Sequence, residues 1–204
     1  MGTAPHRFTV TVFCGSAPGA DPLYADAARA VGEAIASHGM NLVFGGGHVG
    51  LMGEVADAAM KAGAHVTGVI PHALRVREDI HGELSELIVV DTMHERKTIM
   101  SERADAFLAL PGGPGTLEEL TEQWTWAQLG IHEKPVGLLN VDGYYDPFLA
   151  LVANMRDRSF THPRYTDMLV VADEVDAALT ALQDYTPPAR GVVSPGAEMS
   201  ALRP

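Results

Sequence analysis

The sequence predicts an α/β fold: a Rossmann-like, doubly wound parallel sheet of about seven strands with helices on both faces, in a single domain. From Phe8 onward, short β-rich apolar runs alternate with longer alanine-rich amphipathic stretches, the pattern of parallel strands joined by crossover helices. The chain has 204 residues, 47% of them hydrophobic, which suffices for one well-buried domain and not for two of ordinary size. Three of the apolar runs end in glycine-rich turns, where such sheets bind ligands.

The expected elements follow this alternation along the chain. Strands are predicted over residues 8–14, 41–45, 65–70, 86–91, 106–110, 135–140 and 168–172. Helices are predicted over residues 22–38, 50–62, 93–104, 116–129, 146–158 and 174–183. The first helix has clear ends, because Asp21 is a capping residue, Pro22 suits the first helical position, and Gly39 follows the last turn.

Composition divides the chain into a central domain and two ends. We expect an N-terminal tail over residues 1–7, one Rossmann-like domain over 8–185, and a flexible tail over 186–204, where proline, glycine and serine replace large apolar residues. The connection over 71–85 is unusually charged. Long polar connections at the carboxyl end of a parallel sheet commonly carry ligand contacts.

Charge and hydropathy exclude several classes of partner. The formal net charge of −12 disfavours nucleic acid and anionic membranes, which require a basic face. No apolar segment approaches the roughly 20 residues of a membrane span, and no signal peptide is visible in the first residues. The single cysteine, Cys14, cannot form an internal disulfide. These features predict a cytoplasmic protein with a small ligand.

Three glycine-rich turns follow predicted strands: Cys14-Gly15-Ser16, Gly45-Gly46-Gly47 and Pro111-Gly112-Gly113. Each by itself is equally consistent with the tight packing of a strand against a helix. Because the carboxyl ends of parallel strands meet at one edge of the sheet, the three turns are expected to line one crevice. Together they favour a site for a nucleotide phosphate.

The third turn opens into a helix, whose free N–H groups and dipole stabilise an anion. No Gly-Lys-Ser/Thr follows its glycines, and no Gly-x-Gly-x-x-Gly follows the first strand, so a nucleoside triphosphatase or a dinucleotide dehydrogenase is disfavoured. A nucleoside monophosphate fits better.

Charged residues lie near this turn in two places, and each has a structural alternative. Glu118 and Glu119 follow the turn, where Thr116 and Glu119 also match a capping box, in which Glu119 would bind the N–H of Thr116. Arg96 and Lys97 lie at the start of a predicted helix, where the dipole disfavours cations. The alternative there is a solvated first turn beside acidic residues.

Two of these segments, Met-His-Glu-Arg-Lys at 93–97 and Pro-Gly-Gly-Pro-Gly-Thr-Leu-Glu-Glu at 111–119, carry a resemblance to a known family. The sequence resembles the LOG family of cytokinin riboside 5′-monophosphate phosphoribohydrolases, often labelled lysine decarboxylase-like. The likeness extends over most of the chain, through residues 12–16, 45–53 and 124–130. Pro114, Ala17 and His48 depart from residues common in the family, which affects the shape and polarity of the base pocket.

The resemblance implies a set of site residues. The catalytic pair would be Arg96 and Glu119. The substrate-binding residues would be Gly15, Ser16, Gly46, Gly47, Glu78, Lys97, Gly112, Gly113, Gly115, Thr116, Glu118 and Thr125. The resemblance further implies a homodimer with the site near the subunit interface, and no cofactor. None of the nine histidines shows metal-ligand spacing, so no metal is expected.

The function implied is hydrolysis of the N-glycosidic bond of an adenosine 5′-monophosphate, with or without an N6 substituent, to free base and ribose 5-phosphate. The alternative is a non-catalytic nucleotide-binding or cofactor-carrier protein of the same fold, which would have no chemical need for Arg96 and Glu119 together. Amino-acid decarboxylation is rejected, because none of the three lysines, Lys61, Lys97 and Lys134, has a convincing setting for a pyridoxal phosphate Schiff base.

Overall fold

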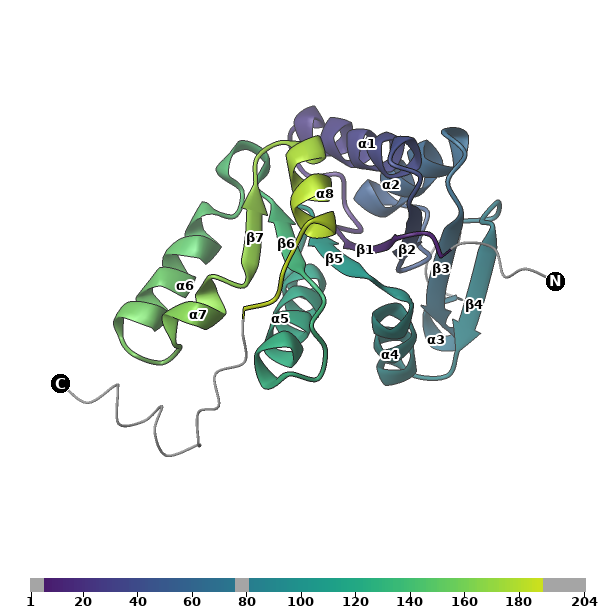
Figure 1. The fold of residues 1–204 in the computed structure, drawn as a ribbon. Coiled ribbons are helices and arrows are strands. Elements are labelled where there is room, and N and C mark those ends of the chain that lie inside the picture. Colours follow the sequence, from purple (N-terminus) through teal and green to yellow (C-terminus); the bar gives the residue numbers. More distant parts are fainter. Residues whose placement is uncertain (1–5, 76–80, 189–204) are drawn as a thin grey trace.

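The computed structural model describes residues 6–75 and 81–188 (Figure 1). Seven strands form one sheet in the order β4-β3-β2-β1-β5-β6-β7, and every neighbouring pair is parallel. The strands are β1 (Thr9–Phe13), β2 (Asn41–Phe44), β3 (Val66–Pro71), β4 (Glu86–Val90), β5 (Ala106–Ala109), β6 (Val136–Leu139) and β7 (Leu169–Ala172). The predicted fold class is confirmed.

The helices alternate with the strands. They are α1 (Pro22–Ser37), α2 (Gly50–Lys61), α3 (His72–Arg75), α4 (Met93–Arg103), α5 (Pro114–Leu129), the 3-10 helix η1 (Val141–Gly143), α6 (Asp146–Asp157), α7 (Pro163–Thr166) and α8 (Val175–Gln183). The predicted first-helix signals are confirmed, because the Asp21 side chain accepts the N–H of Leu23 at 3.0 Å and Gly39 follows the helix with a φ of +68°.

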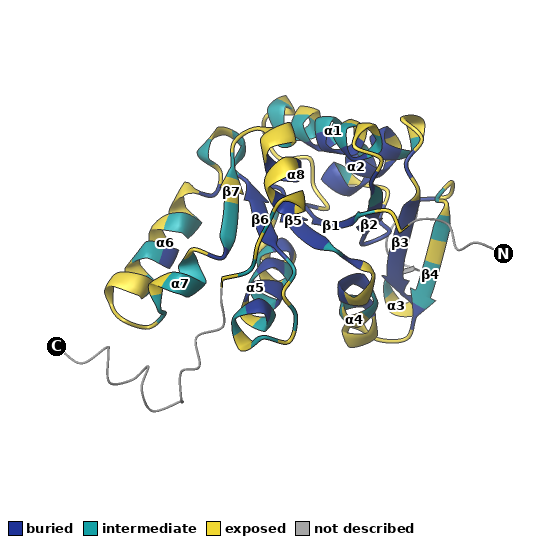
Figure 2. Ribbon diagram, in the orientation of Figure 1, coloured by how far each residue is buried: buried dark blue, intermediate teal, exposed yellow. Residues whose placement is uncertain are grey.

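The two faces of the sheet carry different helices. Helices α1, α2 and α8 cover one face, and α4, α5 and α6 cover the other (Figure 1). The central strands are buried on both sides (Figure 2), which explains why their sequences are nearly continuous apolar runs. Two apolar clusters result, one on each side of the sheet.

Strand β1 lies at the point where the chain changes direction. The chain builds outward from β1 through β2 and β3 to β4, and then returns to place β5 on the other side of β1. Open α/β sheets form their ligand crevice at the carboxyl ends of the strands beside such a switch point. The turns that follow β1 and β5 are two of the three glycine-rich turns.

Helix α5 begins two residues earlier than the sequence predicted. Its N-cap is Gly113, and Pro114 takes the first helical position, where its missing N–H is no loss. Thr116 therefore lies inside the first turn and is not the cap, so the capping box considered for Thr116 and Glu119 is wrong. The spacing of Thr116 and Glu119 does not distinguish a capping box from a helix interior, because a threonine three residues before a glutamate occurs in both.

Three short helices were not predicted: α3, η1 and α7. They have three or four residues each, too few to show a helical period in sequence. Within residues 6–75 and 81–188, no helix has the length and apolarity needed to cross a membrane. Residues 1–5 and 189–204 of the two predicted tails lie outside the described residues, so the division into domain and tails stays a prediction.

Candidate active site

Two of the three glycine-rich turns, those after β1 and β5, are in contact, and α2, which follows the turn after β2, begins against the turn after β1. The N–H of Gly15 donates to the carbonyl of Pro111 at 3.0 Å, and the N–H of Leu51 donates to the carbonyl of Gly15 at 3.0 Å. A Cβ on Gly112 would overlap the Thr116 hydroxyl and would lie 2.8 Å from the nitrogen of Gly15. Glycine at position 112 is thus required for the close approach of the turns after β1 and β5.

The start of α5 offers backbone donors to an anion. Gly113 and Gly115 are exposed, and a Cβ on either would meet no protein atom within 4 Å. Packing within the protein therefore does not require glycine at these two positions, whereas close approach of a ligand to the backbone would. The N–H groups of a first helical turn have no partner within the helix, and the dipole there favours negative charge. Thr116 is buried directly below them.

Helix α4 carries a capping box of its own. The Thr92 hydroxyl accepts the N–H of Glu95 at 3.1 Å, and the Glu95 carboxylate accepts the N–H groups of Thr92 at 3.3 Å and Asp91 at 2.9 Å. This box fixes where α4 begins, and therefore which side of the helix faces the sheet. The negative charge of Glu95 also offsets the cations that follow it in the first turn.

Arg96 points from α4 into the protein and is only 8% exposed. Its Nε donates to the carbonyl of Val69, within β3, at 3.1 Å and its Nη2 to the carbonyl of Gly45, just after β2, at 3.2 Å. A Cβ on Gly45 would overlap the guanidinium, so glycine there makes room for Arg96. The alternative of a solvated first turn is excluded for Arg96.

Glu119 faces Arg96 from the neighbouring helix. One guanidinium nitrogen of Arg96, Nη1, lies 4.0 Å from the Glu119 carboxylate, and the two side chains are 10% and 14% exposed. The residues come from different helices, α4 and α5, and lie 23 positions apart in sequence. The sequence-predicted pair is thus brought together, in a setting that water reaches poorly.

Burial raises the pKa of Glu119 to about 7. This value is the net result of burial, which is the largest cause, of Arg96 and Lys97, which lower the pKa, and of Glu118 and Glu122, which raise it. A carboxyl group that titrates near neutrality can change its protonation at the pH of a reaction, which is typical of groups that take part in acid–base or electrostatic catalysis.

Lys97 lies beside this pair and is held by two carboxylates. Its Nζ lies 2.5 Å from Glu118 Oε1 and 2.8 Å from Glu122 Oε1. Partial burial acts to lower the pKa of Lys97, but these hydrogen bonds outweigh it and the pKa is raised. Lys97 is therefore a cation, and Glu118, at 54% side-chain exposure, is the more accessible partner.

The pKa of Glu119 predicts a pH-dependent difference in stability. Below pH 4.5 the Glu119 carboxyl is protonated in the folded and in the unfolded protein. Between pH 4.5 and about 7 the unfolded chain has lost this proton while the folded protein retains it, so the free energy of unfolding falls as the pH rises. Glutamine does not titrate, so Glu119→Gln lacks this decrease in stability. We expect the melting temperature of Glu119→Gln, relative to the unsubstituted protein, to rise between pH 5 and pH 8. A constant difference across these pH values would contradict the buried, protonated carboxyl.

One histidine cluster was not foreseen from the sequence. His48, Asp57 and His81 place ligand-type atoms within 4.8 Å of one another, the one group of three or more such residues among those the structure describes. His81 Nε2 lies 2.5 Å from Asp57, while His81 Nδ1 accepts the N–H of Glu83 at 3.4 Å. A metal-bound histidine normally donates its second ring N–H. Because Nδ1 is used as an acceptor, His81 is better described as a hydrogen-bonded link between Glu83 and Asp57 than as a metal ligand.

The remaining predicted binding residues lie near the glycine turns, farther along α5, or outside the described residues. Gly46 and Gly47 are buried in the turn after β2, while Ser16 is exposed next to Gly15. Thr125 is exposed six residues after Glu119 on α5, roughly 9 Å farther along the helix, so it does not contact the pair directly within this chain. Glu78 lies outside the described residues. The roles of these residues stay predictions.

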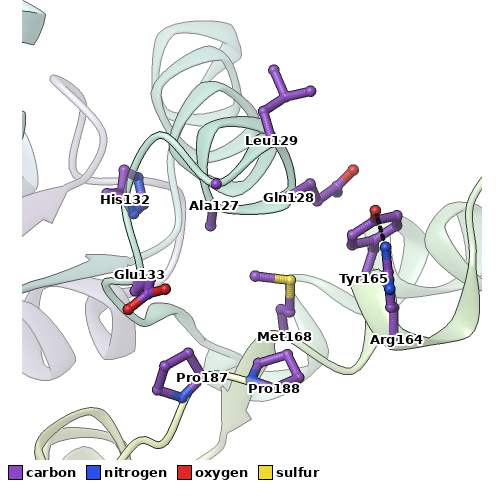
Figure 3. Close-up of a pocket in the computed structure, with 11 residues that line it drawn as sticks. Ala127, Gln128, Leu129, His132, Glu133, Arg164, Tyr165, Met168, Pro187 and Pro188 are labelled. Carbon is purple, nitrogen blue, oxygen red and sulfur yellow. Dashed lines mark hydrogen bonds between the residues drawn. The ribbon is translucent and has the colours of Figure 1, made fainter. Parts of the chain in front are cut away.

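Two pockets flank α5. One, of about 330 Å³, lies beside the glycine turns and has Tyr24 and Tyr144 in its wall. The other, of about 210 Å³, lies at the opposite end of α5 (Figure 3). The second pocket is lined by Ala127, Gln128, Leu129, Gly130, His132, Glu133, Arg164, Tyr165, Met168, Pro187 and Pro188. None of the predicted site residues is among them.

Comparison with known proteins adds independent findings. The family model described as "Possible lysine decarboxylase" matches residues 52–182. The chain is 48% identical over 186 residues to a probable cytokinin riboside 5′-monophosphate phosphoribohydrolase of Oryza sativa subsp. japonica, covering 91% of this chain and 76% of the relative. It is also 48% identical over 178 residues to a cytokinin riboside 5′-monophosphate phosphoribohydrolase of Arabidopsis thaliana, covering 87% and 82% respectively.

Solved structures of similar fold include the molybdenum cofactor carrier protein of Chlamydomonas reinhardtii, with a TM-score of 0.66 and 23% identity over 87% of this chain and 97% of that one. A molybdenum cofactor binding protein of Rippkaea orientalis has a TM-score of 0.66 and 20% identity over 88% and 98%. At this identity the likeness supports the fold alone. The family match and the plant relatives show more: the chain belongs to the lysine decarboxylase-like family, the LOG family of cytokinin riboside 5′-monophosphate phosphoribohydrolases.

Proposed function

We propose that this chain is a phosphoribohydrolase that cleaves the N-glycosidic bond of adenosine 5′-monophosphate, plain or N6-substituted, to free base and ribose 5-phosphate. The observation that carries the proposal is the buried pair of Arg96 and Glu119, 4.0 Å apart, beside the exposed start of α5. The curated relatives at 48% identity, which are named for this reaction, support it.

In the proposed reaction, the N–H groups at the start of α5 hold the 5′-phosphate and thereby place the ribose over the pair. Water attacks the anomeric carbon as its bond to the base nitrogen breaks, and the base leaves with a proton. The transition state resembles an oxocarbenium ion, positive at the anomeric carbon. The Glu119 carboxylate stabilises this charge, aligns the ribose hydroxyls, or deprotonates the water. Arg96 supplies a fixed positive charge to phosphate or leaving base.

Stabilising the cation and deprotonating the water both need the ionised carboxylate of Glu119, whose pKa is raised to about 7. We therefore expect kcat/KM for adenosine monophosphate to rise with pH and to level off above the pKa of Glu119. The measurement is a pH–rate profile between pH 5 and pH 9, corrected for ionisation of the substrate phosphate. A rate that falls through pH 7 would show that the protonated form of Glu119 acts.

Decarboxylation, the activity in the family's description, is not supported by the lysines. Lys97 is bound by Glu118 and Glu122, and Lys134 Nζ donates to the carbonyl of Ser101 at 2.6 Å. Lys61 is exposed in the last turn of α2. None of the three is an unengaged amine in a buried pocket, the setting in which a lysine loses its proton and reacts.

The proposed function is tested by chromatography of the products. The protein is incubated with adenosine monophosphate or its N6-prenylated analogue, and the expected result is stoichiometric release of base and ribose 5-phosphate. Lysine serves as the control substrate and is expected to remain unchanged. Tight binding of either nucleotide without release of base would favour a carrier over a hydrolase.

For the assembly, we propose a cytoplasmic homodimer whose interface includes residues of α4 and α5. Support comes from the exposure of two apolar residues, Met93 at the start of α4 at 43% and Leu129 at the end of α5 at 71%. A two-fold interface uses the same patch on both subunits, which suits exposed apolar positions of this kind. Sedimentation is expected to give a dimer at micromolar concentration, and Leu129→Asp is expected to weaken it. A monomer under these conditions would refute the proposal.

A further inference from the structure

The loop before α5 has three successive carbonyl groups, each with a hydrogen-bond donor from a distant part of the chain. The carbonyl of Leu110 accepts the Tyr145 hydroxyl at 2.6 Å, and that of Pro111 accepts the N–H of Gly15 at 3.0 Å. The carbonyl of Gly112 accepts the Tyr144 hydroxyl at 2.5 Å. Two of the three donors are thus adjacent tyrosines, which no sequence motif marks.

The tyrosines are held in place by the turn after β6. Asp142 and Gly143 have positive φ values, 50° and 71° respectively. These two residues reverse the chain direction immediately before Tyr144. The Asn140 side chain accepts the N–H of Tyr145 at 2.7 Å. The rings of Tyr144 and Tyr145 then pack edge to face, with centroids 5.1 Å apart. Tyr145 is 1% exposed and Tyr144 is 38% exposed.

The orientation of the peptide between Gly112 and Gly113 matters for anion binding. In a trans peptide the carbonyl and the N–H point in opposite directions, so the bond to Tyr144 also directs the N–H of Gly113 away from that ring. Rotation of this peptide meets little steric resistance, because both flanking residues are glycines. A rotated peptide would present a carbonyl oxygen, which repels an anion, where it now presents an N–H.

We propose that Tyr144 is a positioning residue for the anion-binding turn, which prevents the peptide between Gly112 and Gly113 from rotating. Tyr145 fixes the carbonyl of Leu110 in the same way from the core. This inference rests on the proposed function, since it assigns the turn to the 5′-phosphate. It explains why a partly exposed tyrosine directs its hydroxyl to a backbone carbonyl.

The test is Tyr144→Phe, which keeps the ring and removes the donor. Loss of one neutral hydrogen bond corresponds to roughly a 2- to 10-fold change. We expect kcat/KM for adenosine monophosphate to fall within that range and kcat/KM for adenosine to stay unchanged, because only the former uses the turn. The affinity for ribose 5-phosphate, measured by calorimetry, is expected to fall by the same factor.

Tyr165→Phe is the matched control, with kcat/KM and ribose 5-phosphate affinity expected to stay unchanged. Tyr165 lines the pocket at the other end of α5, and its substitution removes a tyrosine hydroxyl that bonds to Arg164 without changing either carbonyl bond. Equal losses on adenosine and its monophosphate, or an unchanged affinity of Tyr144→Phe for ribose 5-phosphate, would overturn the inference. Calorimetry does not depend on turnover, so these outcomes remain distinct from failure of the proposed hydrolysis, which would appear as no base release by the unsubstituted protein.

Discussion

Glu119→Gln is expected to reduce turnover of adenosine monophosphate by roughly 10²- to 10⁴-fold while the protein remains folded. The substitution keeps the size of the side chain and removes the charge that would stabilise the oxocarbenium-like state. Arg96→Ala is expected to cause a similar loss of turnover. It also leaves the carbonyls of Val69 and Gly45 without their donors, so it is the less selective probe of catalysis.

Glu122→Gln is the matched control for the loss of charge. Glu122 lies on the same helix and removing it also changes the charge near Lys97, but Glu118 still binds that lysine. We expect its turnover to stay within a few-fold of the unsubstituted protein. Near-normal turnover by Glu119→Gln, together with a lower melting temperature at pH 8, would mean that Glu119 is structural.

Removal of the 5′-phosphate from the substrate is the second change with a large expected effect. A charge-assisted hydrogen bond contributes about 1.5–3 kcal/mol, so two bonds to the start of α5 correspond to roughly 10²- to 10⁴-fold in kcat/KM. The binding energy of the phosphate also orients the ribose for attack. A prenyl group on N6 contributes about 1–3 kcal/mol by burial, which is a smaller factor.

Both contributions are measured by comparing kcat/KM for four substrates: adenosine and its monophosphate, each with and without the prenyl group. The phosphate is expected to have the larger effect in both pairs. Equal rates on adenosine and adenosine monophosphate would show that the turn after β5 does not bind the phosphate.

The sequence was most informative where local chemistry and tertiary structure agree. The ends of α1 were predictable because Asp21, Pro22 and Gly39 each favour one position at a helix end. The contact between the turns after β1 and β5 was predictable because neighbouring parallel strands end at one edge of the sheet. Family resemblance, and not local pattern, singled out Arg96 and Glu119, whose contact joins two helices.

Other features depend on packing that no local pattern contains. Arg96 looks like a surface residue in sequence, and its burial becomes apparent only when Gly45 and Val69 are placed beside it. The raised pKa of Glu119 comes mainly from burial, which sequence spacing does not express. Tyr144 lies 32 residues from the carbonyl that it binds, in a turn whose strand, β6, is a neighbour of β5.

The most direct test of the site is a crystal structure of Glu119→Gln after a brief soak with adenosine monophosphate, which this variant should bind and cleave only slowly. The phosphate oxygens are expected within about 3.2 Å of N–H groups at the start of α5, including those of Gly115 and Thr116. The anomeric carbon is expected to lie between residue 119 and Arg96. A nucleotide bound elsewhere, such as the far pocket at the end of α5, or one whose phosphate does not contact this turn, would contradict the account.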